Sequence, residues 1–247
     1  CDMDQEGMLV EGFEEEGMLI TIHNAPYYPA HMETLGYRKD VDWLEFQIRV
    51  PQEKMEKMQR LQERVLQRYH LRLLEPHSKR ELRPYVLKAF DLLDRTYQNL
   101  YGTVPLTAGL VRKYYQQFML LIHPAYVKLI LDEEGRLVGL GMAAPSVSRA
   151  VKKSRGRLLP WGWLRLLRAL YGKNPVLDLY LVGVVPEYQK KGLTAVLLHS
   201  MTEEARRRGF QVAETGPELE TNTQVQSLWK YYEARQHRRR RCWIKEL

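Results

Sequence analysis

The order of apolar and amphipathic segments predicts an α/β protein whose sheet is flanked by helices. Short runs rich in Val, Leu and Tyr, typical of strands, alternate with longer stretches whose apolar residues recur at helical spacing. A hairpin is indicated where two apolar runs flank residues 133–136, because Gly135 can adopt the positive φ that such a turn needs. With 247 residues, 45% of them apolar, the chain can bury a full core and has room for one domain and part of another.

The first fifty residues predict a partial N-terminal unit. Residues 18–22 are expected to form a strand, 26–35 a helix closed by Gly36, and 41–50 a second strand. These elements are too few to fold alone, so residues 1–50 are interpreted as the C-terminal part of a first domain or as a structural extension. Because the chain begins at a cysteine, we expect a fragment or a processed product. Residues 51–69 predict a charged linking helix with one apolar stripe.

Residues 70–247 contain enough elements for a complete domain. In chain order, we expect a strand at 71–75, helices at 79–101 and 108–121, strands at 126–132, 137–144 and 175–185, a helix at 194–208, a strand at 210–214, a helix at 223–234 and a strand at 240–245.

The turn after the strand at 175–185 carries the strongest chemical signal. It joins an apolar strand to a helix through Lys190, Lys191 and Gly192. The first amides of a helix lack internal partners and, together with the positive end of the helix dipole, form an anion site. Gly192 lets a ligand approach the backbone, and the two lysines add full charges. The expected ligand is a pyrophosphate.

This turn resembles the acyl-coenzyme A signature of the GCN5-related N-acetyltransferase (GNAT) superfamily, Val-x-Pro-x-Tyr-(Arg/Gln)-x-x-Gly-x-(Gly/Ala), over residues 184–194. One position departs from it, because Thr194 stands where the second small residue is usually Gly. The resemblance implies a mixed, largely antiparallel sheet flanked by helices, the acyl-CoA N-acyltransferase fold, over residues 70–247. It also implies acetyl-CoA or another acyl-CoA as co-substrate, without a metal. The residues implied to contact that co-substrate are Val184, Val185, Gln189, Lys190, Lys191, Gly192, Leu193, Thr194, Ala195 and Asn222.

A second motif begins at Asn222 and resembles the family's Asn-x-x-Ala-x-x-Leu-Tyr spacing on the helix after the next strand. Trp229 occupies the place of the tyrosine that commonly protonates the leaving thiolate. An indole N–H does not ionise usefully, so a tyrosine acid must come from nearby. We expect Tyr232, three residues further on and on the same helix face, to be that acid, with packing of a large aromatic as the alternative. More weakly, residues 24–37 resemble the closing portion of another domain of this type.

Direct acyl transfer from a thioester to an amine needs a base for the amine proton and a polarised carbonyl, but no covalent nucleophile. The resemblance places the thioester carbonyl against the backbone amides of Val184 and Val185. Three carboxylates are candidates for the base: Glu214 first, then Asp178, which lies inside an apolar strand, and Glu218. For each of them a structural ion pair or a solvated loop position is the alternative.

Residues 151–173 mix Trp and Leu with seven basic residues and contain no acid. This composition suits a helix at an anionic membrane surface, where it would receive a lipid-like acceptor. The alternative is a lid or insertion whose apolar residues pack on the sheet while its charges face water.

The remaining composition limits partners and location. The formal net charge is +8, and four arginines stand at 238–241, but no aromatic platform or nucleic-acid motif accompanies them, so nucleic acid is not the expected partner. No apolar run has spanning length, and the first residues lack the form of a signal peptide. Cys1 and Cys242 form neither a metal spacing nor a disulfide framework, which suits a cytoplasmic location. The sequence indicates no oligomeric state.

Together these observations predict an acyl-CoA-dependent N-acyltransferase that transfers an acetyl group to a small-molecule or lipid-like amine by direct attack. A non-catalytic acyl-CoA-binding or membrane-associated module is the alternative, and the substitution at Trp229 keeps it open.

Overall fold

A computed structural model describes residues 7–98 and 100–246, with the backbone alone described for residues 115–121 and 224. Cys1 lies outside the described residues. The chain forms two compact units. Unit 1 comprises Pro51–Ala144 and Tyr180–Arg208, and unit 2 comprises the described residues within Asp2–Val50, Pro145–Leu179 and Gly209–Leu247. Strand β6 (Val176–Val184) runs from unit 2 into unit 1.

Unit 1 contains strands in the order β3-β4-β5, followed by the second half of β6. β3 (Arg72–Leu74), β4 (Val127–Leu131) and β5 (Leu137–Pro145) pair antiparallel. Its helices are α2 (Glu56–Arg68), α3 (Lys79–Tyr97), α4 (Ala108–Leu121) and α7 (Leu193–Arg207). Gly141 of β5 allows α7 to pack closely, because a Cβ there would lie 2.7 Å from the sulfur of Met201.

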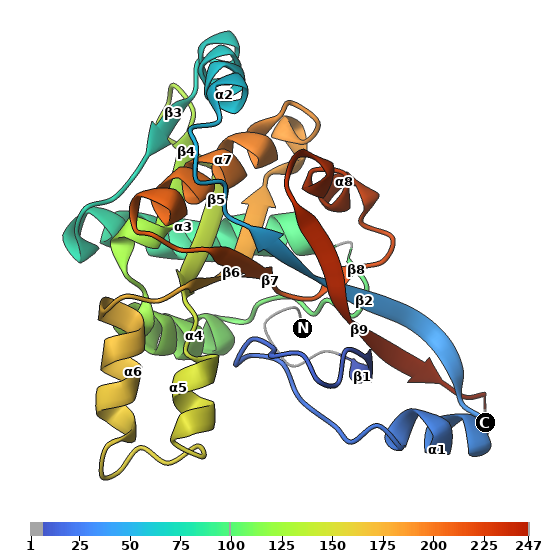
Figure 1. The fold of residues 1–247 in the computed structure, drawn as a ribbon. Coiled ribbons are helices and arrows are strands. Elements are labelled where there is room, and N and C mark those ends of the chain that lie inside the picture. Colours follow the sequence, from blue (N-terminus) through green and yellow to red (C-terminus); the bar gives the residue numbers. More distant parts are fainter. Residues whose placement is uncertain (1–6, 99, 247) are drawn as a thin grey trace. The chain divides into compact units, whose positions relative to one another are not determined.

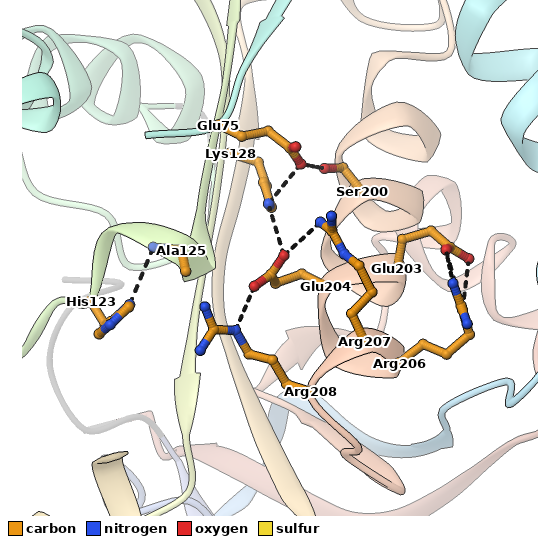
Figure 2. A network of polar contacts seen from close by, with 10 residues as sticks. All are labelled: Glu75, His123, Ala125, Lys128, Ser200, Glu203, Glu204, Arg206, Arg207 and Arg208. Atoms are coloured by element: carbon orange, nitrogen blue, oxygen red, sulfur yellow. Dashed lines mark hydrogen bonds and ion pairs between the residues drawn. The ribbon is translucent and has the colours of Figure 1, made fainter. Parts of the chain in front are cut away.

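A polar network ties β4 to α7 inside unit 1 (Figure 2). Lys128 of β4 is buried, and its Nζ lies 2.7 Å from Glu75 Oε1, which also accepts a 2.7 Å hydrogen bond from the Ser200 hydroxyl of α7. Burial alone would raise the pKa of Glu75, but Lys128 and Ser200 outweigh it and hold that pKa below its ordinary value. Glu204 completes the network, 3.9 Å from Lys128 Nζ and 2.6 Å from Arg207 Nη2. The buried ammonium is therefore neutralised by groups of its own unit.

Unit 2 contains strands in the order β1-β9-β2-β7, followed by the first half of β6. β2 (Arg38–Arg49) and β9 (Ala234–Ile244) form a long antiparallel ribbon (Figure 1). β1 (Met8–Glu11) pairs antiparallel with β9, while β7 (Val212–Thr215) and β8 (Glu218–Leu219) pair antiparallel with β2. β6 and β7 are parallel. The helices are α1 (Tyr28–Thr34), α5 (Ser148–Lys153), α6 (Gly162–Tyr171) and α8 (Thr223–Gln226).

The mixed, largely antiparallel sheet flanked by helices confirms the predicted fold class. Several local predictions were wrong. Residues 18–22 form no strand, and the first strand lies instead at Met8–Glu11. The helix expected at 223–234 ends at Gln226 and is followed by a 3-10 turn at Trp229–Tyr231. The last strand begins at Ala234 and not at residue 240, because its arginines find acidic partners on β2.

The predicted division at residues 50 and 70 differs from the two units, since β2 of the first fifty residues pairs with β7 and β9. The assignment of residues 1–50 to a first domain stays a prediction. None of the helices in the described parts of the chain combines the length and apolar character that crossing a bilayer demands.

Candidate functional site

The strand-to-helix turn of unit 1 has the geometry of an anion site. β6 ends at Val184, a 3-10 turn covers Pro186–Tyr188, and Gly192 caps α7 with a left-handed φ of +87°. The first helical hydrogen bond of α7 is donated by the Val196 N–H to the Gly192 carbonyl oxygen, at 3.1 Å. The amides of the preceding residues, Leu193, Thr194 and Ala195, therefore point out of the helix N-terminus toward the place where a phosphate would bind.

Side chains around the turn hold its shape. Lys191 Nζ lies 4.4 Å from the centre of the Tyr188 ring and 5.2 Å from that of Tyr69, so two aromatic faces position its charge. The Gln189 side-chain amide donates a 3.3 Å hydrogen bond to the Val184 carbonyl oxygen. Lys190 has a φ of +62°, an uncommon conformation for a residue with a side chain.

One of the two amides expected beside the thioester is already engaged. The Val185 N–H donates to the carbonyl oxygen of Val138 at 3.1 Å, within unit 1. This bond occupies the amide and weighs against the role expected for Val185. Of the signature residues in α7, Leu193 and Ala195 are buried and Thr194 is half-buried, so the first two can reach a ligand only through their backbone.

Unit 2 contains a row of polar side chains that crosses its strands. Asp178 of β6 is in register with Glu214 of β7, which is in register with Gln47 of β2, which in turn faces Arg235 of β9. Neighbours in register share one face of a sheet. The Gln47 amide donates to Glu214 Oε1 at 2.7 Å, and Arg235 Nε donates to Gln47 Oε1 at 2.9 Å. The row brings together two of the three carboxylates that the sequence proposed as bases.

A cavity of about 280 Å³ opens beside this row within unit 2. Five carboxylates line it, accompanied by one basic residue, Arg149. The acidic residues are Glu14, Glu15, Glu16, Asp178 and Glu214. Arg149 is already engaged, because its Nε donates to Glu16 Oε2 at 2.8 Å. Glu15 is likewise paired, with Arg235, so the acidic surplus of the cavity comes from Glu14, Asp178 and Glu214. This surplus favours a cationic ligand such as an ammonium group.

Asp178 is the most unusual member of the cavity wall. It is completely buried, and among the described residues neither of its carboxyl oxygens has a partner with good hydrogen-bond geometry. Burial raises the pKa of Asp178 to about 7, the nearby Ser146 hydroxyl opposes that shift, and the Glu214 carboxylate adds to it. A carboxyl group that changes its charge near neutral pH can accept a proton from a bound amine.

His237 lies between Glu214 and Glu15, and the sequence had assigned neither His237 nor Glu15 a role. His237 Nε2 lies 2.8 Å from Glu214 Oε2, off the line that a hydrogen bond requires, and its ring is buried. The Arg235 guanidinium donates two hydrogen bonds to Glu15 and holds the pKa of that carboxyl below its usual value. A register shift in the β2–β9 pairing between Glu45 and Phe46 lies next to His237.

The third proposed base, Glu218, lies elsewhere in unit 2, in β8. Its Oε2 accepts a 3.2 Å hydrogen bond from the Trp229 indole, and burial raises the pKa of Glu218 to about 8 despite that bond. Tyr232 packs against Trp229 with ring centres 6.3 Å apart, but it follows the 3-10 turn in an extended conformation. The helix-face argument for Tyr232 was therefore wrong, although its ring does lie beside Trp229.

Asn222, expected to contact the co-substrate, caps α8. Its side-chain oxygen accepts from the Val225 N–H at 3.4 Å. The arginines at 238–241 are committed within unit 2: Arg238 and Arg240 pair with Glu45, and Arg239 and Arg241 pair with Asp42.

Comparison with known proteins agrees with this architecture. A family model described as the acetyltransferase (GNAT) family matches residues 87–234, so the chain belongs to this family. The chain is similar in fold to a GCN5-related N-acetyltransferase from Sphaerobacter thermophilus, with a TM-score of 0.57 at 13% identity over 96% of this chain and 58% of that one. A tandem GNAT protein from the clavulanic acid biosynthesis pathway gives a TM-score of 0.53 at 11% identity, over 96% of this chain and 62% of that one.

Two curated relatives share sequence with the chain. It is 25% identical to the protein YghO of Escherichia coli over 98% of this chain and 63% of the relative. It is 26% identical to a bacterial ceramide synthase of Caulobacter vibrioides over 75% of this chain and 48% of the relative. The chain thus spans less than two thirds of the length of either relative.

Proposed function

We propose that the chain is an acyl-CoA-dependent N-acyltransferase whose acceptor is the primary amine of a lipid. The observation that carries this proposal is the buried Asp178 beside Glu214 in the wall of an acidic cavity. Family membership supports the acyl donor, and the turn at Gly192 supports a pyrophosphate-containing one.

The size and charge of the cavity support an amine headgroup. About 280 Å³ is below the usual range for a drug-sized ligand, so the cavity suits a headgroup better than a whole lipid. A ceramide is a lipid amide, and the similarity to a bacterial ceramide synthase supports a long-chain amino alcohol as the acceptor. Acetyl-CoA and long-chain acyl-CoA remain the two donors to compare.

The residues of the cavity suit the proton transfers of the reaction. An alkyl amine is mostly protonated at neutral pH, with a pKa of ~10, and must lose a proton before it can attack. The cluster of carboxylates holds the ammonium, and the ionised form of Asp178 takes the proton. Attack forms the C–N bond and breaks the C–S bond, and the departing thiolate takes a proton, for which Tyr232 is our candidate donor.

Release of the coenzyme A thiol tests this proposal. We expect the purified chain to release thiol from an acyl-CoA only when a long-chain amino alcohol is present, and Asp178→Asn to lower kcat by about 10²–10⁴-fold, the usual contribution of a general base. Glu214→Gln should raise KM for the amine more than it lowers kcat, because it removes charge that holds the ammonium. Glu53→Gln, at an exposed carboxylate of unit 1, is the matched control and should leave both constants unchanged.

Two outcomes would contradict the proposal. Full activity of Asp178→Asn would remove Asp178 from the mechanism. Acyl-CoA binding without thiol release for any long-chain amine would favour a non-catalytic acyl-CoA-binding module.

A further inference from the structure

Helices α5 and α6 form an arm of unit 2 whose apolar side chains are left uncovered. The two helices lie side by side, joined by the loop at 154–161, which is at the far end of the arm in Figure 1. Large apolar side chains at the loop and along α6 are exposed, with Leu159 at 75% and Trp161 at 65%. The others are Leu158, Trp163, Leu164, Leu167 and Tyr171. The alternative in which these residues pack on the sheet is therefore wrong for them.

The charge of the α5–α6 arm, defined as residues 148–173, is entirely positive. It contains eight basic residues and no acid, and its basic residues are Arg149, Lys152, Lys153, Arg155, Arg157, Arg165, Arg168 and Lys173. Among the described contacts, Glu16 pairs with Arg149 and Lys152 at the base of the arm. The other basic residues precede and follow the exposed tryptophans in the sequence, and the arm itself contains no acid that could pair with them. Interfacial Trp and Leu combined with clustered Lys and Arg are complementary to a surface of anionic lipid headgroups.

Local hydrogen bonds hold the arm in shape. The Trp163 indole donates to the Pro160 carbonyl oxygen at 3.0 Å, which fixes the end of the loop against α6. Arg165 Nη1 donates to the carbonyl oxygen of Lys153 at 2.9 Å, which ties α6 to α5. Because these hydrogen bonds already order the arm, docking of its exposed apolar side chains costs less conformational entropy.

The base of the arm forms part of the wall of the acidic cavity. Ser146, Ser148 and Arg149 line the cavity where the arm begins, and Asn174 lines it where the arm ends. The Asn174 side-chain amide joins the two ends, donating to the Ser146 carbonyl oxygen at 2.7 Å and to that of Ala169 at 3.0 Å. A membrane bound by the arm would thus be attached to the same segment that shapes the cavity.

We propose that the α5–α6 arm docks the protein on an anionic lipid surface, with Leu158, Leu159 and Trp161 entering the headgroup region while the flanking cations contact phosphates. This inference goes beyond the proposed function, because docking needs neither acyl-CoA nor turnover. If both hold, the arm delivers the protein to the membrane in which a lipid amine resides.

Binding to vesicles tests the docking surface directly. The whole chain is mixed with phosphatidylcholine vesicles, with and without phosphatidylglycerol, and bound protein is separated by flotation while tryptophan emission is recorded. We expect binding to the phosphatidylglycerol vesicles with a blue shift of the emission, and at least about tenfold weaker binding to phosphatidylcholine alone.

Two sets of variants separate the apolar and the electrostatic contributions. Leu158→Ser with Trp161→Ser, and separately Lys153, Arg157 and Arg168→Gln, should each weaken binding to anionic vesicles at least about tenfold. The controls change equally exposed positions outside the arm: Leu35→Ser with Tyr231→Ser, and Lys54, Lys57 and Arg64→Gln. These controls should bind as the unmodified chain does.

Two results would overturn docking. In the first, the unmodified chain does not bind anionic vesicles. In the second, the arm variants and their controls lose vesicle binding equally. Either result would leave the proposed function standing if thiol release with a detergent-dispersed amine persists. Conversely, vesicle binding without any thiol release would support docking and count against the acyltransferase.

Discussion

At the scale of single residues, Asp178 links the candidate chemistry to stability. Its folded-state pKa of about 7 lies above the value of ~3.9 expected in the unfolded chain. Between these two pH values the folded state keeps a proton that the unfolded state has lost. The contribution of Asp178 to the free energy of unfolding is therefore greatest below about pH 4. It decreases as the pH rises to about 7 and stays constant above that pH.

Asp178→Asn removes this titration, and the free energy of unfolding should show it. We expect the variant to gain stability relative to the unmodified chain as the pH rises from about 4 to about 7, by up to ~4 kcal/mol for a shift of this size. Urea unfolding followed at several pH values gives the difference. Glu218→Gln should behave in the same direction, because burial also raises the pKa of Glu218. A difference between Asp178→Asn and the unmodified chain that does not change with pH would contradict the assigned burial.

At the scale of elements, the pairing of β2 with β9 explains why the arginine run is structural. Arg240 is fully buried, its Nε donates to Glu45, and its Nη1 donates to the Ile22 carbonyl oxygen at 2.7 Å. Arg240→Met leaves the buried Glu45 carboxylate without this partner, so we expect a loss of about 3–5 kcal/mol in the free energy of unfolding. Arg38→Gln, which removes an exposed pair with Glu246, should change stability little. Denaturant midpoints measure both losses. Equal midpoints for Arg240→Met and Arg38→Gln would contradict a structural role for the buried pair.

Helix α7 and strand β9 show how far an element can be predicted from the sequence. α7 was predicted to within one residue at either end, because its apolar spacing and the preceding glycine are local signals. β9 was expected six residues too late, since buried arginines are rare and their partners, Asp42 and Glu45, lie some two hundred positions away. One signal for this pairing was available in the sequence. The acids of the predicted strand at 41–50 are opposite in charge to the arginines at 238–241.

At the scale of the whole molecule, the family was predictable and the lining of the acidic cavity in unit 2 was not. The signature turn is contiguous in sequence, whereas the cavity draws on β2, β6, β7, the start of α5 and residues 14–17. Asp178 and Glu214 could be proposed because each is a carboxylate in or beside an apolar strand. Gln47 and His237 could not be proposed, because only the pairing of the strands brings them to Glu214. Glu15 could not be proposed either, because it meets His237 from a segment outside the strands.

Acyl-CoA binding should stabilise the folded chain as a whole, since a ligand that binds only the folded state adds its binding free energy to folding. At about 100 times Kd the gain is ~2.7 kcal/mol, which for a chain of this length corresponds to a rise in Tm of roughly 5–10 °C. Gly192→Ala should abolish that rise, because its Cβ blocks the approach of phosphate and lies 3.3 Å from Val65. Gly102→Ala is the matched control, with a φ of +71° and no neighbour within 4 Å of the added Cβ. Both variants carry the same kind of backbone strain, so both should have a lower Tm than the unmodified chain without ligand. If acyl-CoA still raises the Tm of both variants, the turn at Gly192 is not the binding site.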